Sequence, residues 1–143
     1  MMNRAFRPLF SNPAVRSYAK KIVHNKGAGK AIGAYSPAIQ HGNTLYVSGQ
    51  LGLVDGKLVS EDVQEQAKVA LTNMKNIIEG AGSSMDNVLK CTVLLDDISN
   101  FSKVNEVYAS FFPSNQPARA AFAVKSLPAG GKVEIEAIAA IGE

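Results

Sequence analysis

The sequence predicts an α+β domain in which two helices pack on one face of a mixed β-sheet. Two observations support this prediction. Segments typical of strands alternate with two segments of helical periodicity, in the order strands, helix, strand, helix, strands. In addition, the 143 residues suffice for one domain and contain neither an internal repeat nor a low-complexity linker. Helices that share one face of a sheet would bury both of their apolar stripes.

Short strands are expected before the first helix. Residues 21–24 (KIVH) have the content of a strand and precede a glycine-rich loop, residues 25–38. Residues 44–51 (TLYVSGQL) are rich in strand-forming side chains and include Gly49, where another group can closely approach the backbone. Residues 52–60 carry an Asp-Gly pair between two apolar pieces, which is the pattern of a hairpin.

Two helices are predicted from apolar residues that recur at helical spacing. Ser60 is the expected N-cap of the first helix, with acidic residues directly after it. The apolar spacing then continues over residues 63–81, and a glycine at position 80 or 82 ends the helix. The second helix ends before Pro113. Its apolar face consists of Phe101, Val104, Tyr108, Phe111 and Phe112.

The remaining segments are predicted strands. Residues 87–97 (NVLKCTVLLDD) are β-branched and apolar, so we expect a buried strand between the helices. Two further strands lie around residues 119–124 and 132–141, separated by the turn SLPAGG. In the last strand the charged residues at 132, 134 and 136 alternate with apolar ones, so the charged side chains share one face.

The basic charge of the chain is confined to its beginning. The formal net charge is +3, but the first 30 residues contain seven basic residues and no acidic one. The remaining chain has 8 basic and 12 acidic residues, a formal net charge of −4. Because phosphate contacts dominate the affinity for nucleic acids, this charge argues against nucleic acid as a partner. No apolar run approaches the ~20 residues of a membrane-spanning helix, so no membrane partner is expected.

Residues 1–18 have the composition of a mitochondrial transit peptide. They are rich in arginine, serine, alanine and apolar residues, and they contain no acidic residue. We therefore expect residues 1–18 to be a targeting segment that is cleaved off, residues 19–143 to form the folded domain, and the protein to be located in the mitochondrial matrix. The alternative is a basic tail that contacts RNA or anionic lipid.

Arg119 is the only arginine after Arg16, and every other positively charged residue from Lys20 to Lys132 is a lysine. A guanidinium binds a carboxylate through two parallel hydrogen bonds, which an ammonium cannot do. Arg119 follows a proline and opens an apolar run, where an unpaired charge would be costly. Two interpretations remain open: a surface or ion-paired arginine, and a clamp for a ligand that carries a carboxylate.

Few other residues suggest chemistry. Glu134 and Glu136 are either members of a solvated strand face or carboxylates that hold a water and transfer a proton. The single cysteine, Cys91, lies in an apolar strand and is expected to be a buried, unreactive thiol. The two histidines lack the partners of a catalytic triad or a metal site. The sequence therefore favours non-covalent chemistry without a metal.

Five segments, taken in order and spacing, resemble the RidA (YjgF) family of enamine/imine deaminases. The resemblance covers roughly residues 20–142, about the whole domain. The segments are IGAYSPA, VSGQLGL, NVLKCTVLLDDISNFSKVNEVYASFF, PARAAFAV and VEIEAIA.

The resemblance implies a fold, an assembly and a reaction. The fold is chorismate-mutase-like, and three copies form a homotrimer with a ligand cleft at each subunit interface. The reaction is the hydrolysis of 2-aminoacrylate and related 2-imino acids, such as 2-iminobutanoate, to 2-keto acids and ammonia. It requires neither a metal nor an organic cofactor. Loss of 2-aminoacrylate in this way would protect enzymes that use pyridoxal phosphate and support mitochondrial amino-acid metabolism, including isoleucine synthesis.

The resemblance also implies roles for individual residues. Arg119 would clamp the substrate carboxylate, and Glu134 would position the water that attacks the imine carbon. The pocket would be completed by Tyr35, by Ser48 and Gly49 at its floor, and by Asn105 and Phe101 at its wall. At position 121 some members carry cysteine, whereas this chain has Ala121, which excludes a thiol-based role there.

Two rival functions belong to other classes. One is a metabolite-binding or chaperone-like interaction protein that binds 2-keto acids without converting them. The other is an RNA-directed inhibitor of translation, for which the negative charge of the domain is unfavourable.

Overall fold

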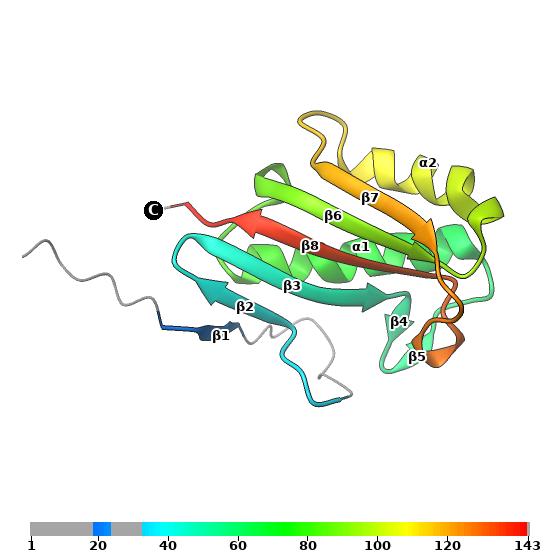
Figure 1. Ribbon diagram of the computed structural model, residues 1–143, viewed down its shortest axis with the longest axis horizontal. Helices are drawn as coiled ribbons and strands as arrows, with labels where there is room; N and C mark the ends of the chain where they lie inside the picture. Colours follow the sequence, from blue (N-terminus) through cyan, green and yellow to red (C-terminus); the bar gives the residue numbers. More distant parts are fainter. Residues whose placement is uncertain (1–18, 24–32, 143) are drawn as a thin grey trace, which may run out of the picture.

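A computed structural model describes residues 19–23 and 33–142 of the chain (Figure 1). The predicted transit peptide, His24 and most of the predicted glycine-rich loop lie outside these residues.

The described strands form a six-stranded mixed sheet and a small hairpin. The sheet has the order β1-β2-β3-β8-β6-β7; all neighbours are antiparallel except β6 and β7, which are parallel. This confirms the predicted mixed sheet. The strands are β1 (Lys21–Val23), β2 (Ala38–His41), β3 (Thr44–Leu51), β6 (Val88–Leu95), β7 (Ala118–Ala123) and β8 (Val133–Ala140).

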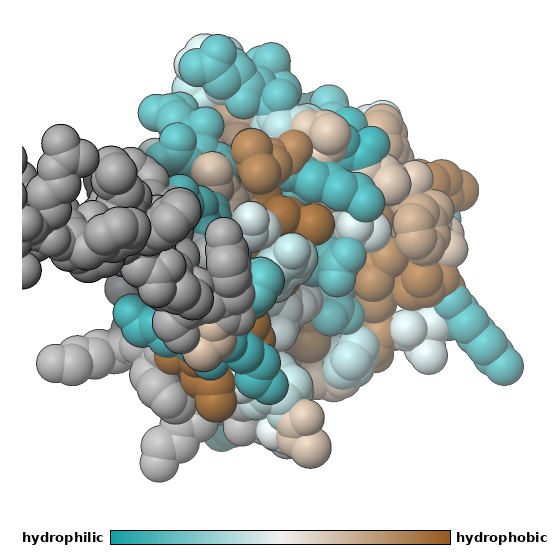
Figure 2. Space-filling view, turned by 60° about the vertical axis from the view of Figure 1, so that its left-hand side comes forward, coloured by the Kyte–Doolittle hydropathy of each residue, from teal (hydrophilic) through white to brown (hydrophobic). Residues whose placement is uncertain are grey.

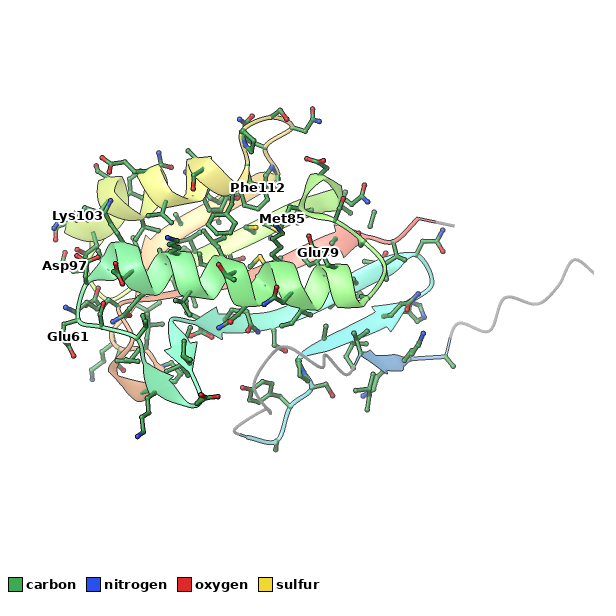
Figure 3. The ribbon with its side chains drawn as sticks, turned by 180° about the vertical axis from the view of Figure 1, so that it is seen from behind. Glu61, Glu79, Met85, Asp97, Lys103 and Phe112 are labelled. Atoms are coloured by element: carbon green, nitrogen blue, oxygen red, sulfur yellow. The ribbon has the colours of Figure 1, made fainter. Side chains whose placement is uncertain are left out.

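Two helices, α1 (Val63–Gly80) and α2 (Phe101–Phe111), lie side by side on one face of the sheet, behind it in Figure 1. Helix α1 lies across β3 and β8 and also contacts α2. From behind, in Figure 3, Glu79 is seen on α1, Lys103 on α2, and Glu61 in the loop beside the start of α1. The prediction of two helices on one face is confirmed. No helix of the described residues is long and apolar enough to cross a membrane.

The core lies between the sheet and the helices. Alternate residues of β8 are buried there, namely Val133, Ile135, Ala137 and Ala139. They pack against the fully buried stripe of α1, which includes Leu71, Met74, Ile77 and Ile78. Because successive side chains of a strand point to opposite faces, the residues between them face away from the helices.

That opposite face of the sheet, called the open face below, carries no second layer of helices or strands among the described residues. It combines half-exposed aromatic side chains with polar and aliphatic ones: Tyr46 and Phe122 are each 48% exposed. In Figure 2 this face is directed to the right, and hydrophobic and hydrophilic residues are interleaved on that side of the molecule. Its other members include Thr92, Leu94, Glu134, Glu136 and Ile138.

Most predicted element bounds are confirmed, but three details differ. The N-cap of α1 is Asp62, not Ser60, because the Asp62 side chain accepts hydrogen bonds from the backbone N–H groups of residues 64 and 65, both at 2.9 Å. Strand β2 was not predicted, since four residues give too little periodicity. Finally, β7 is an exposed edge strand, so Arg119 does not sit in a buried apolar run.

The Asp-Gly hairpin is confirmed between β4 (Leu53–Val54) and β5 (Lys57–Leu58). Asp55 and Gly56 have φ values of 50° and 78°. Positive φ at both central residues is the requirement of a type I′ turn, for which Asp-Gly is a preferred pair.

Candidate functional site

The open face contains a hollow of about 510 Å³, called the Glu134 hollow below. Tyr35, Ser48, Gly49 and Glu134 line it, and all four are site residues predicted from the sequence. The other lining residues are Gly33, Leu51, Pro128 and Glu136. Strands β3 and β8 and the loop before β2 therefore meet at one place.

A break in the pairing of β3 shapes the floor of this hollow. The register between β3 and β8 shifts between Val47 and Gln50, as it does at a β-bulge. Within the bulge, the backbone N–H of Ser48 donates to the carbonyl of Pro37 at 3.0 Å. The Ser48 hydroxyl donates to the carbonyl of Ser36 at 2.7 Å. Ser48 thus ties the loop that carries Tyr35 to the floor, which is a structural role.

Gly49 leaves the space that the Glu134 carboxylate occupies. A Cβ atom built on Gly49 would collide with Oε1 of Glu134 and would lie 2.8 Å from its carboxyl carbon. Contacts of this kind essentially never occur between real atoms. Glycine is therefore needed here for close packing against a side chain, and the carboxylate lies directly over the β3 backbone.

The environment of Glu134 disfavours its ionised form. Burial is the larger cause and the nearby Glu136 carboxylate the smaller one, and both raise the pKa of Glu134. A raised pKa means that the folded chain binds this proton more tightly than the unfolded chain does. Stability is therefore lost as the pH rises through that pKa, so the ionised carboxylate is destabilising at neutral pH.

Arg119 lies in β7 and is held by side chains of α2. Its Nη1 donates to Oδ1 of Asn105 at 2.9 Å. Its guanidinium carbon lies 4.5 Å from the ring centroid of Tyr108 and 5.6 Å from that of Phe101. No carboxylate in residues 19–23 and 33–142 forms an ion pair with it. The exposed guanidinium is thus oriented by its neighbours, and no described carboxylate neutralises it.

Arg119 and Glu134 lie on opposite faces of the sheet. Arg119 is in register with Cys91, whose buried side chain faces the helices. Glu134 is in register with Leu94, which alternates with buried neighbours and faces the open side. The structure thus gathers the predicted residues into two groups: the Glu134 hollow, and Arg119 with Asn105 and Phe101. Within one copy of the chain, these two groups therefore face away from each other.

Two further residues belong to these groups. Tyr108 supports the arginine, although its helical spacing predicts only a core position. Glu136 lines the Glu134 hollow, and the alternation in β8 had already placed it on the same face. For Tyr108, the available signal was its spacing of three and seven residues from Asn105 and Phe101, which places all three on one stripe of a helix.

The arrangement offers two chemical functions: an oriented cation that can bind a carboxylate, and a carboxylate that can accept a proton from water. Cys91 is fully buried, and burial raises the pKa of its thiol, in agreement with an unreactive cysteine. Within the described part of the chain, no three His, Cys, Asp or Glu side chains gather as metal ligands would.

Comparison with known proteins gives a consistent family. The sequence model of the family described as endoribonuclease L-PSP matches residues 25–141. The 2-iminobutanoate/2-iminopropanoate deaminase of Bos taurus is 52% identical over 128 residues, which span 88% of this chain and 93% of the bovine one. The Homo sapiens protein of the same name is 48% identical with the same coverage. Reactive Intermediate Deaminase A, chloroplastic, of Arabidopsis thaliana is 42% identical over 87% of this chain and 68% of its own.

Solved structures give the same result. RidA from an Antarctic Psychrobacter bacterium superimposes with a TM-score of 0.81 at 42% identity, covering 85% of this chain and 99% of that one. TdcF of E. coli, solved with bound serine, has a TM-score of 0.81 at 37% identity and the same coverage.

Proposed function

Because the chain belongs to the endoribonuclease L-PSP family, which includes the RidA (YjgF) proteins, we propose that it is a 2-iminobutanoate/2-iminopropanoate deaminase. It hydrolyses reactive enamines and imines to 2-keto acids and ammonia. The observation that carries this conclusion is the 48–52% identity, over 128 residues, to mammalian proteins of that name. The family match at residues 25–141 includes every residue of both site groups.

Arg119 binds the carboxylate that all these substrates share. A guanidinium has five N–H donors in one plane, and among the described residues one of them binds a protein group, the side chain of Asn105. Two parallel hydrogen bonds to a carboxylate fix the plane of the substrate as well as its position. This orientation brings the imine carbon to a defined point, which is the main requirement for a reaction that already proceeds in water.

Glu134 holds the attacking water. The enamine first tautomerises to the imine, and a water then adds to the imine carbon. As the C–O bond forms, Glu134 accepts a proton from that water. Return of the proton to nitrogen and loss of ammonia from the tetrahedral carbinolamine give the 2-keto acid. A raised pKa suits this two-way transfer, because it makes the carboxylate a stronger base than an ordinary glutamate while the proton can still be returned.

The Glu134 hollow suits a substrate with a short side chain. Tyr35, Leu51 and Pro128 contribute apolar surface next to the carboxylate. Leu51 is confined from behind, since a Cβ built on Gly131 would lie 2.7 Å from its Cδ2 atom. A methyl or ethyl group, as in 2-iminopropanoate and 2-iminobutanoate, fits such a wall better than a long chain does.

The complete site forms between two copies of the chain, in a homotrimer with one cleft at each interface. The position of Arg119 and Glu134 on opposite faces of one sheet supports this assembly. So does the open face, where Tyr46 and Phe122 are half exposed and would be covered by a neighbour. In the assembly, Arg119 of one copy and Glu134 of the next act on the same substrate.

Mixing two inactive variants tests the function and the shared site together. We would generate 2-aminoacrylate with a serine dehydratase and measure pyruvate release by protein that lacks residues 1–18. The wild type is expected to accelerate this release, and Arg119→Ala and Glu134→Gln are expected to lose the acceleration. Co-refolding the two variants in equal amounts should restore about a quarter of the sites, because those sites combine two intact halves.

Each outcome has a separate meaning. If the wild type does not accelerate pyruvate release, the deaminase proposal fails for this substrate and a metabolite-binding protein takes its place. If the wild type is active but the mixture stays as inactive as its components, the shared site is wrong and each copy carries a complete site of its own.

Residues 1–18 are a transit peptide that directs the chain to the mitochondrial matrix. Their basic, acid-free composition supports this role. There the enzyme removes 2-aminoacrylate before it damages enzymes that use pyridoxal phosphate, and so supports amino-acid metabolism, including isoleucine synthesis. Import into isolated mitochondria, followed by N-terminal sequencing of the mature protein, tests the location. Residues 1–18 fused to a reporter should suffice for import.

The family description raises cleavage of RNA as a second candidate. The formal net charge of −4 after residue 30 is unfavourable for it. RNA cleavage that falls steeply with salt and survives Arg119→Ala would support this activity. Cleavage absent from highly purified protein would exclude it.

A further inference from the structure

One stripe of α2 supports the only arginine of the described residues. Phe101, Asn105 and Tyr108 are spaced by four and three residues, so their side chains emerge on the same side of the helix. Two of them present aromatic rings to the guanidinium of Arg119, at 4.5 and 5.6 Å. The third accepts a hydrogen bond from Nη1 at 2.9 Å. We call these three residues the arginine cradle.

The cradle restrains the guanidinium in two independent ways. The rings lie within the ~6 Å at which an aromatic face attracts a cation, and this attraction fixes the flat side of the group. The hydrogen bond to Asn105 lies in the guanidinium plane and fixes its rotation within that plane. The directions of the remaining N–H donors are then fixed, including those of a parallel pair that could bind a carboxylate.

Tyr108 connects the cradle to the core. Its side chain is 4% exposed, and its ring packs against Phe112 with centroids 4.7 Å apart. The Tyr108 hydroxyl is buried beside the thiol of Cys91, a weak partner, and has no other hydrogen-bond partner among the described residues. The ring therefore cannot move away without disturbing the packing between α2 and the sheet, so it gives the arginine a rigid support.

We propose that Asn105 and Tyr108 are positioning residues, which act on the substrate only by orienting Arg119. This inference rests on the proposed function and gives Asn105 a role other than the expected one at the pocket wall. An exposed arginine on a long, flexible side chain would lose rotamer freedom on binding. The cradle restricts that freedom before the ligand arrives, which improves affinity through preorganisation rather than through a new contact.

The test compares the two positions with and without the guanidinium. Asn105→Ala and Tyr108→Leu should each weaken the binding of 2-oxobutanoate and raise KM by roughly tenfold, the effect of one hydrogen bond to a charged group, with a smaller change in kcat. Tyr108→Phe keeps the ring and should recover most of the affinity that Tyr108→Leu loses. Ser102→Ala, on the exposed side of the same helix, serves as the matched control.

The decisive comparison uses Arg119→Lys as the background. Lysine has no planar fork, so the cradle has no group to orient, and Asn105→Ala should then have almost no further effect. If Asn105 instead touched the ligand, its removal would weaken binding by the same factor in both backgrounds, and the positioning role would be overturned. An unchanged affinity in Asn105→Ala would overturn it as well.

Binding of 2-oxobutanoate, measured by calorimetry, separates this inference from the proposed function. Loss of affinity on removal of the cradle, in a protein that does not accelerate deamination, would keep the inference and reject the enzyme. If the wild type deaminates normally and the cradle variants are as active as the wild type, the proposed function is kept and this inference is rejected. If Tyr108→Leu does not assemble, Asn105→Ala and its Arg119→Lys comparison still decide the question, because Asn105 is not a core residue.

Discussion

The lack of a side chain at Gly49 determines where the Glu134 carboxylate can lie. The φ of this residue is not in the left-handed region, so its backbone does not require glycine. What requires glycine is the carboxylate of Glu134, which lies where a side chain of residue 49 would begin. The sequence indicates only that something approaches this backbone closely, whereas the structure identifies the approaching group as the proposed base.

Gly49→Ala should therefore damage catalysis more than stability. The added methyl group displaces the Glu134 carboxylate, and a displacement near 1 Å lowers kcat by on the order of 100-fold. Gly142→Ala is the control, because a Cβ there meets no atom within 4 Å. Pyruvate release and the urea midpoint should be measured for both variants. Full activity in Gly49→Ala would show that the attacking water is not held by a Glu134 carboxylate in the place where the structure has it.

The pH dependence of the reaction should depend on the pKa of Glu134, and through it on the neighbouring Glu136 carboxylate. Glu134 acts as a base only when ionised, so kcat/KM falls as the pH falls through its pKa. Burial and Glu136 raise that pKa, so the acid limb should lie above the 4.5 of an ordinary glutamate. Glu136→Gln removes one of the two causes and should move the limb to lower pH. Glu106→Gln, remote on α2, should leave the limb unmoved, and an identical limb in Glu136→Gln would contradict the assignment.

At the scale of elements, the start of α1 shows how neighbouring polar residues compete for one role. Ser60 and Asp62 can both cap a helix, and a preference scale does not separate them. In the structure Asp62 caps the helix, while the Ser60 hydroxyl accepts a hydrogen bond from the backbone N–H of Asp62 at 3.1 Å. Ser60 thus shapes the residue before the helix rather than its first turn.

Replacing the cap should separate the two residues energetically. Asp62→Ala removes the acceptor of two backbone N–H groups and should lower the free energy of unfolding by ~1 kcal/mol. Ser60→Ala loses one exposed hydrogen bond and should have a smaller effect. The comparison uses urea unfolding at one fixed protein concentration, because the proposed assembly would make stability depend on concentration. Equal losses would contradict the assignment of Asp62.

Elements with strong periodicity were predictable from the sequence, and short or context-dependent ones were not. Helix α1 and strand β8 each present a long alternation of buried and exposed residues, and their faces follow from it. Strand β2 has only four residues. Gln66 would be assigned to a solvated helix face, yet it is fully buried. There it accepts a hydrogen bond from the backbone N–H of Lys132 and donates to the carbonyl of Ser60, each at 2.8 Å.

For the whole molecule, the relation between Arg119 and Glu134 could not be predicted. Alternation places Glu134 on one face of β8, but the face of Arg119 depends on the register of β7 against β6. A shift of one residue in that register would turn Arg119 to the open face. Long-range pairing sets the register, and the periodicity of a short edge strand carries no information about it.

Disrupting the open face should abolish assembly and activity together. Phe122 is 48% exposed in the single chain, so Phe122→Glu leaves the core intact but places a charge where a neighbour would pack. We expect monomers in sedimentation experiments and loss of pyruvate release. Val54→Glu changes an equally exposed residue, 53%, in the β4–β5 hairpin and should remain assembled and active. An assembled, active Phe122→Glu would show that the interface lies elsewhere.

The place of Arg119 in strand β7 gives it a second role, which concerns the single folded chain. An edge strand presents unsatisfied backbone groups to any passing chain, and charged side chains are a common protection against such pairing. Arg119 is the only charged residue in β7, whose other members are alanines and one phenylalanine. A substitution that removes this charge therefore creates an uncharged, aggregation-prone edge. Variants that lack a charge at position 119 should therefore aggregate or be degraded more readily. Their abundance in the cell should be low, in addition to any loss of catalytic activity.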